Sequence, residues 1–74
     1  MQVTTTHTEL LTWHRLPGKL PDADTTVLVE AQYADEVWPG YLDGTTWRWA
    51  TGLPVTGKVV AWADMPAGVK GAGF

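Results

Sequence analysis

The chain has no cysteine and no serine among its 74 residues, and it has only two histidines. Without cysteine, no disulfide can hold the fold and no thiol can act as a nucleophile. The lack of serine excludes a serine nucleophile. Two histidines without any thiolate argue against a structural zinc site. These absences remove the commonest routes to covalent catalysis and to a metal-stabilised fold.

Positive charge is scarce and scattered along the chain. Five lysines and arginines stand against eight acidic residues, and the net charge is −3. Binding to DNA or RNA through the phosphates needs clustered basic side chains, so we expect no direct nucleic-acid contact. No apolar run approaches the roughly 18 residues of a membrane span, and the first residues lack the pattern of a signal peptide. We therefore expect a cytosolic protein that has no contact with a membrane.

Tryptophan, by contrast, is abundant, with five copies in the chain. A domain of this size buries only about 60% of the surface that its unfolded chain exposes. One buried aromatic side chain removes roughly 150–250 Å² from water, so five could form most of a small core. We predict a single domain over residues 1–74, with an ordered core over about residues 10–66 and frayed tails at 1–8 and 67–74.

Alternating β-branched and aromatic residues predict strands over 27–33, 37–42, 45–50 and 58–63. Glycine-rich and proline-rich turns separate these runs. The pattern predicts a mainly β fold, a small antiparallel meander of four to five strands with one tryptophan-rich core face.

The pairing of these strands follows from keeping one face apolar. With Asp43-Gly44 as a two-residue loop, Gly40 faces Trp47 and Trp38 faces Trp49. We expect Trp38 and Trp47 in the core and Trp49 nearer the rim. The remaining two tryptophans are expected to be half-buried edges of the core, and any exposed one is a candidate hot spot for a partner.

A two-residue loop at Ala34-Asp35 extends the same face to the preceding strand, and Ala31 then faces Trp38. A three-residue loop would instead bury the carboxylate of Glu30, which costs several kcal/mol without a partner. On the opposite face Glu30 and Arg48 could pair across the middle strand. Such an exposed pair is worth only about 0–1 kcal/mol.

One five-residue pattern occurs twice, as WHRLP at Trp13–Pro17 and as WADMP at Trp62–Pro66. Each copy predicts a strand end, with a tryptophan beside the core and a proline that stops the pairing. In the second copy Val60 and Trp62 are expected to share a face. A short helix over Thr8–Arg15 is the alternative for the first copy.

Several short stretches follow one another in a fixed order: Trp13, Leu20-Pro21, Val27–Val29, Val37–Tyr41, Asp43-Gly44, Trp47, Trp62 and Met65-Pro66. This order, over about residues 13–66, resembles a small domain family of unknown function that is widespread in tailed phages and prophages. Its members read Trp-x-x-Val, Leu-Pro, an acid-rich turn, Val-Leu-Val, Trp-x-Gly-Tyr and a closing Trp-x-x-Leu-Pro. Pro39 departs from that pattern. The resemblance implies a phage or prophage origin and a small, mostly β fold, and it supplies no catalytic residues.

No constellation of side chains points to catalysis, to a cofactor or to a metal. His14 lies near Thr12 only in sequence and is expected on the surface. Asp22 and Asp24 fall in a turn region over residues 18–26, where aspartate is favoured for its own backbone hydrogen bonds. Leu20 of the same region is expected to tuck against the core. We therefore predict that the protein is not an enzyme.

The predicted function is a small, non-enzymatic, protein-binding module encoded by a phage or prophage. Its partner would be a host bacterial protein or complex in the host cytoplasm, which it would block as anti-CRISPR proteins block a bacterial defence system. The expected partner surface combines the face opposite the tryptophans with turn acids: Asp22, Asp24, Leu28, Glu30, Asp35, Glu36, Tyr41 and Arg48. An edge strand could also form a homodimer. The alternative function is a structural or accessory virion component.

Overall fold

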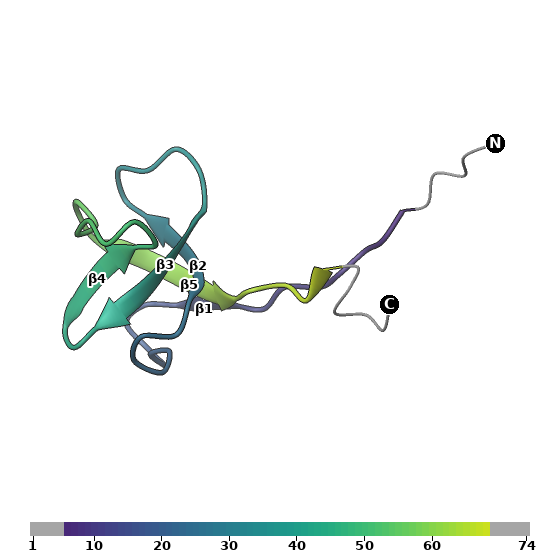
Figure 1. Cartoon of the computed structure of the whole chain (residues 1–74), viewed down its shortest axis with the longest axis horizontal. Coiled ribbons are helices and arrows are strands. Elements are labelled where there is room, and N and C mark those ends of the chain that lie inside the picture. Colours follow the sequence, from purple (N-terminus) through teal and green to yellow (C-terminus); the bar gives the residue numbers. More distant parts are fainter. Residues whose placement is uncertain (1–5, 69–74) are drawn as a thin grey trace.

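The computed structural model describes residues 6–68, which contain five antiparallel strands in a single sheet (Figure 1). The strands are β1 (Trp13–Arg15), β2 (Val27–Ala31), β3 (Trp38–Asp43), β4 (Thr46–Trp49) and β5 (Val59–Asp64). The mainly β fold is therefore confirmed. Residues 1–5 and 69–74, which include most of the predicted frayed tails, lie outside the described residues.

The strand order is β1-β5-β2-β3-β4, so the meander is limited to the three middle strands of the chain. The last strand, β5, lies between β1 and β2 and pairs with both. Trp13 stands opposite Ala63, and His14 stands opposite Trp62. The first two residues of each similar stretch thus pair with those of the other. The extended backbone of β1 shows that a helix over Thr8–Arg15 is wrong.

The β3–β4 hairpin keeps the predicted faces but shifts the predicted pairing by two residues. Gly40 pairs with Trp49, rather than with Trp47, and Trp47 pairs with Leu42. The cause is the turn, because Asp43 remains in the strand opposite Thr46 and Gly44 takes the left-handed conformation at φ 62°. A shift of two residues leaves every side chain on its face, since the period of a strand is two.

The β2–β3 hairpin shows the same kind of shift. Val29 pairs with Trp38 and Val27 pairs with Gly40, so the expected pairing of Ala31 with Trp38 is wrong. Ala34-Asp35 is not a two-residue turn; the whole connection over residues 32–37 lies outside the strands. It starts with a tight turn in which the Ala34 N–H donates to the Ala31 carbonyl over 3.2 Å.

One face of the sheet, which we name the inner face, carries the core. Its buried cluster is Val27, Val29, Val59 and Trp62, packed against the half-buried side chains of Leu16, Trp47, Trp49 and Val55. Trp62 is 3% exposed, whereas Trp38 is 55% exposed. The predictions of a core Trp38 and a half-buried Trp62 are both wrong, because Trp62 lies on a central strand while Trp38 begins β3 at one end of the sheet.

A β-bulge in β5 explains why the prediction for Val60 differs from the structure. Glu30 pairs with Ala61, but the next residue of β2, Ala31, pairs with Val59, which leaves Val60 as an extra residue. Val59 is therefore buried in the core at 5% exposure, and Val60 is 42% exposed. Val60 and Trp62 do not share the inner face, as simple alternation had predicted.

The connection between β1 and β2 crosses the inner face beside Trp62. The indole Nε1–H of Trp62 donates a hydrogen bond to the Lys19 carbonyl over 2.8 Å. Pro21 is buried and lines a small hollow together with Val27 and Trp62, whereas Leu20 is exposed. The expectation that Leu20 tucks against the core is therefore wrong, and Pro21 takes that place.

The segment after β4 folds back along that strand and covers its outer edge. The Trp49 N–H donates to the Leu53 carbonyl over 2.8 Å, and the Val55 N–H donates to the Trp47 carbonyl over 2.9 Å. Arg48 and Pro54 form the bridge between these two bonds. Among residues 6–68, β1 is thus the edge strand whose second edge is bonded to no other backbone segment. No helix in this part of the chain has the length and apolarity of a membrane span.

Candidate protein-binding groove

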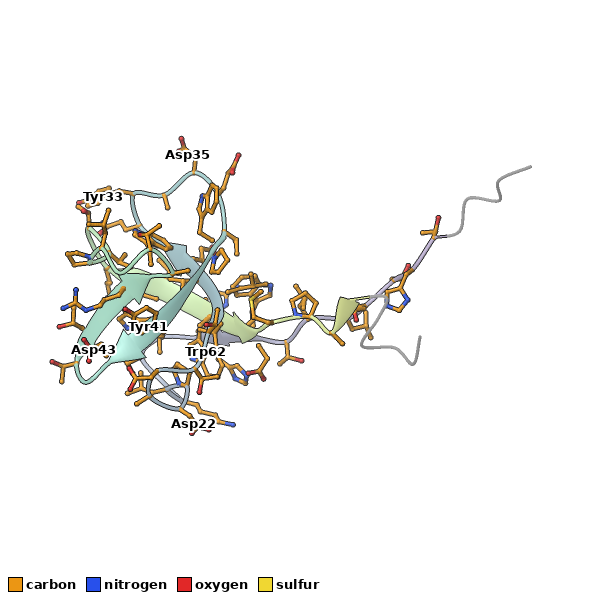
Figure 2. All side chains as sticks on the ribbon, viewed as in Figure 1. Asp22, Tyr33, Asp35, Tyr41, Asp43 and Trp62 are labelled. Carbon is orange, nitrogen blue, oxygen red and sulfur yellow. The ribbon has the colours of Figure 1, made fainter. Side chains whose placement is uncertain are left out.

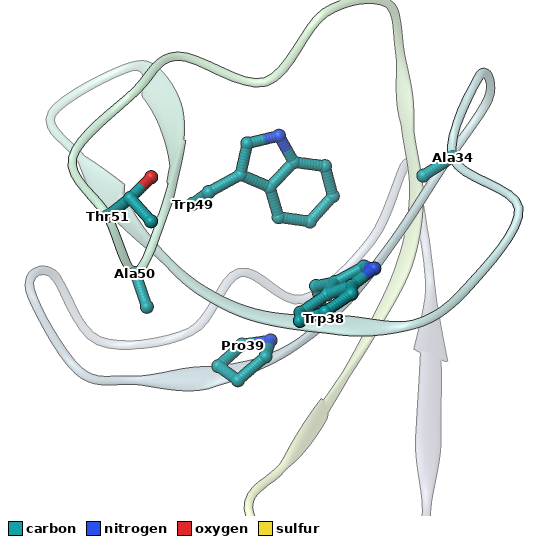
Figure 3. Close-up of a pocket in the computed structure, with 6 residues that line it drawn as sticks. All are labelled: Ala34, Trp38, Pro39, Trp49, Ala50 and Thr51. Atoms are coloured by element: carbon teal, nitrogen blue, oxygen red, sulfur yellow. The ribbon is translucent and has the colours of Figure 1, made fainter.

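An open groove of about 530 Å³ lies at the end of the sheet where β3 begins and β4 ends (Figure 3). It is lined by Ala34, Trp38, Pro39, Trp49, Ala50 and Thr51. Figure 3 shows Ala34 at one end of the groove and Ala50 and Thr51 at the other, with the two indole rings between them. Thr51 contributes the only hydroxyl among these side chains, so the lining is almost wholly apolar.

The register of the hairpin places the two tryptophans together. Trp49 pairs with Gly40, and Trp38 lies two residues before Gly40 on the same face of β3. The Ala50 N–H donates to the Pro39 carbonyl over 3.0 Å, which keeps the strands paired up to the groove. Because Gly40 has no side chain, Trp49 has no cross-strand side chain on β3, and its ring packs against the core cluster.

Arg48 holds the wall that the 50–52 turn forms. Its Nη1–H donates to the Gly52 carbonyl over 3.0 Å, and its Nε–H donates to Asp43 Oδ2 over 3.0 Å. The Gly52 N–H in turn donates to the Trp49 carbonyl over 2.8 Å. The turn is therefore fixed before any ligand arrives, which lowers the entropic cost of binding.

The other wall comes from the connection between β2 and β3. The Gln32 N–H donates to the Lys58 carbonyl over 2.8 Å, which ties the start of this connection to the loop before β5. The ring of Tyr33 lies so close to Gly57 that a Cβ built there would stand 2.5 Å from Tyr33 Cδ2. Ala34 follows directly, so its position in the groove depends on these two contacts.

Negative charge lies next to the groove. Asp35 and Glu36 are both exposed and belong to the connection between Ala34 and Trp38, which both line it. Figure 2 shows Asp35 at the tip of this connection. An incoming ligand therefore meets two indoles with two carboxylates on the connection beside them.

The eight residues of the expected partner surface fall into three groups. Leu28, Glu30, Tyr41 and Arg48 lie on the face opposite the core, which we name the outer face. Asp22 and Asp24 belong to the connection before β2, and Asp35 and Glu36 belong to the connection between β2 and β3. Figure 2 shows Asp22 and Asp35 on opposite sides of the globular part. The structure therefore gathers four of the eight on one face and leaves the turn acids apart.

The expected pair between Glu30 and Arg48 does not form. Arg48 stands opposite Tyr41 and bonds to Asp43, whereas Glu30 stands beside Ala61 of β5. The shift of both hairpins by two residues separates Glu30 from Arg48 along β3. Arg48 is thus occupied within the fold, as a support of the groove wall.

Sequence reasoning missed Trp38 as a surface residue. Its neighbours gave one signal, because two acids precede it and Pro39 follows it. Proline inside a strand is confined to edges, strand starts and bulges, so Trp38 belongs at a sheet margin rather than at its centre.

Within residues 6–68, no three side chains of histidine, aspartate or glutamate cluster in a way that could hold a metal ion. Comparison of the chain with protein-family models, with curated proteins and with solved structures finds no match.

Proposed function

We propose that the protein is a protein-binding module and that the groove around Trp38 and Trp49 receives the partner. The observation that carries this proposal is the 55% exposure of Trp38 beside the half-buried ring of Trp49. Tryptophan is enriched among the few residues that dominate binding energy at interfaces. A large indole left in water by a chain this small favours a surface that a partner covers.

The chemistry of the groove favours an apolar protein segment over a nucleic acid. Its volume of about 530 Å³ suits several apolar side chains or one extended segment. Stacked bases would bring phosphates toward Asp35 and Glu36, and the net charge of −3 would repel them further. A protein segment that carries lysine or arginine next to its apolar residues would instead be attracted.

The phage family that the sequence resembles suggests the partner's origin. We propose a host bacterial protein or complex, met in the host cytoplasm, that the module covers and thereby blocks. A component of a bacterial defence system fits this role, as it does for anti-CRISPR proteins. The resemblance and the groove support the proposal independently, because one concerns the origin of the chain and the other its surface.

The test is capture of host proteins from lysate by the tagged chain, followed by mass spectrometry. Trp38→Ala removes the exposed indole and should abolish capture of the partner. Val60→Ala is the control, since it removes an exposed apolar side chain that does not line the groove, and it should leave capture intact. Circular dichroism of each variant checks that the fold is kept.

A second variant separates the two candidate surfaces. Tyr41→Ala alters the outer face without touching the groove, and we expect it to capture the partner as the unaltered chain does. Loss of capture with Tyr41→Ala but not with Trp38→Ala would move the binding site to the outer face and overturn the groove assignment. Recovery of the chain in purified virions, with no host protein captured, would overturn the proposed function itself.

A further inference from the structure

The second edge of β1 is the unpaired margin of the sheet among residues 6–68. One edge of β1 is bonded to β5, and the opposite margin of the sheet, at β4, is covered by Leu53–Val55. The residues before β1 continue it as an extended arm beside the chain that follows β5, and the Gly68 N–H donates to the Glu9 carboxylate over 2.9 Å (Figure 1). An edge of this kind is a template for another strand.

Apolar side chains are exposed along this edge. Leu10 is 97% exposed, and Leu11 and Trp13 are 41% and 38% exposed. Soluble proteins protect edge strands with lysine, proline, bulges or covering loops. Within Glu9–Arg15 the only charged residues are the two at its ends, so this edge is left unprotected where its apolar residues lie.

The hydrogen bonds of β1 show which backbone groups point outward. The Leu16 N–H donates to the Val60 carbonyl over 2.9 Å, in the same register as the rest of the β1–β5 pair. Hydrogen-bonded and non-hydrogen-bonded pairs alternate in an antiparallel ladder, so the backbone of His14 is also hydrogen-bonded to β5. Trp13 and Arg15 therefore point their N–H and C=O groups away from β5. Continuing the alternation along the arm adds Leu11 to the outward set.

An antiparallel partner identical to this chain must therefore pair odd-numbered residues with odd-numbered ones. Centring the pair on Thr12 places Thr12 opposite Thr12, Leu11 opposite Trp13 and Glu9 opposite Arg15. Threonine pairs, aromatic–aliphatic pairs and opposite charges are the cross-strand pairs that stabilise sheets, at about 0.2–1 kcal/mol each. Twofold symmetry supplies the last two pairs twice.

The two neighbouring registers give less favourable cross-strand pairs. Centring on Trp13 places Leu11 opposite the Arg15 charge and leaves Glu9 opposite Pro17, which has no N–H to donate. Centring on Leu11 places the Glu9 carboxylate opposite the indole of Trp13, so Arg15 has no acid across from it. Charge complementarity thus selects one register.

We propose that two copies of the chain pair through their β1 edges in this register and form a twofold symmetric dimer with one continuous sheet. The partner is a second copy of this chain, recognised by the Glu9–Arg15 and Leu11–Trp13 pairs. Glu9 already accepts a hydrogen bond from the Gly68 N–H, and its Oε1 lies 3.3 Å from His7 Nε2. An ionised carboxylate has room for a further donor. The groove lies near the opposite margin of the sheet, so the dimer presents two grooves.

Sedimentation equilibrium on the full chain, from micromolar to several hundred micromolar, tests the dimer. Glu9→Arg and Arg15→Glu should each weaken dimerisation by about tenfold, because each replaces two attractive pairs with two repulsive ones. The double variant Glu9→Arg/Arg15→Glu restores opposite charges and should regain the original dissociation constant. Leu53→Lys, which changes an exposed leucine elsewhere, should have no effect.

The double variant makes the test specific to the register. It still lacks the bond between Glu9 and Gly68, so recovery cannot come from repair of the arm. A chain that stays monomeric at every concentration, or a dimer that the double variant does not restore, would overturn the proposal. The result is independent of host-protein capture, so the dimer and the binding function can fail separately.

Discussion

The indole of Trp62 is bonded to the backbone of Lys19, which lies 43 residues earlier in the chain. The imidazole ring of His14 stacks on the same indole with ring centroids 4.3 Å apart. Trp62 therefore connects three segments: the interior strand β5, the edge strand β1 and the connection between β1 and β2. Closure of the inner face therefore depends on Trp62.

Replacing Trp62 should destabilise the fold in two separable steps. Trp62→Phe keeps an aromatic ring but leaves the Lys19 carbonyl without its donor, and it should lower the free energy of unfolding by about 1–2 kcal/mol. Trp62→Ala also empties the centre of the core and should cost about 3–5 kcal/mol. Urea denaturation followed by circular dichroism measures both.

The exposed tryptophan serves as the comparison for Trp62. Trp38→Ala removes the same side chain from a position that is 55% exposed, and we expect a loss below about 1 kcal/mol. An equal loss of unfolding free energy for Trp38→Ala and Trp62→Ala would contradict the assignment of Trp62 to the core and of Trp38 to the binding surface.

Gly40→Ala should be costly although it adds a single methyl group. A Cβ at Gly40 would lie 2.6 Å from the Arg48 carbonyl oxygen and 3.0 Å from Val29 Cγ2. The strand pair must separate to admit it, and we expect a loss of about 1–3 kcal/mol in thermal or urea unfolding.

The control for Gly40 is a glycine whose surroundings are open. A Cβ at Gly44 would meet no atom within 4 Å, and Gly44 takes φ 62°, which asparagine tolerates. Gly44→Asn should therefore cost less than about 1 kcal/mol. If it destabilises as much as Gly40→Ala, close approach of β3 and β4 is not the reason that position 40 is glycine.

Because of the bulge in β5, Val59 is buried while the adjacent Val60 is exposed. Val59→Ala removes core packing and should cost about 2 kcal/mol, whereas Val60→Ala should change the free energy of unfolding by no more than about 0.5 kcal/mol. Simple alternation with Trp62 predicts the opposite order. Chemical denaturation of the two variants under one condition decides between them.

The faces of β2, β3 and β4 could be predicted from the sequence because alternation has a period of two. A register shift of two residues changes the partners of Gly40 but not the side on which its neighbours lie. The shifts themselves came from turn geometry, since Asp43 stays in the strand and the connection after Ala31 is long. Local turn signals did not distinguish these possibilities.

The insertion of β5 between β1 and β2 could not be predicted from local patterns. Pairing between segments this far apart depends on the whole set of strands, and the run from Val59 to Ala63 is apolar at every position, so alternation could not reveal the bulge. Burial of Trp62 follows from that insertion. The groove was missed because the predicted pairing placed Trp38 opposite Ala31, whereas the shift of the β2–β3 hairpin leaves Trp38 at the end of the sheet.

Arg48 should control the groove wall more than the global stability. Arg48→Ala removes the donor to the Gly52 carbonyl, which should cost about 1 kcal/mol locally and raise the hydrogen-exchange rate of the Gly52 amide roughly fivefold. Asp43→Asn removes only the exposed ion pair, worth about 0–1 kcal/mol, and should have a smaller effect on that amide. Hydrogen exchange of the Gly52 amide, measured by NMR, reports directly on opening of the turn. If Asp43→Asn exposes the Gly52 amide as much as Arg48→Ala does, the ion pair rather than the bond to the Gly52 carbonyl holds the wall.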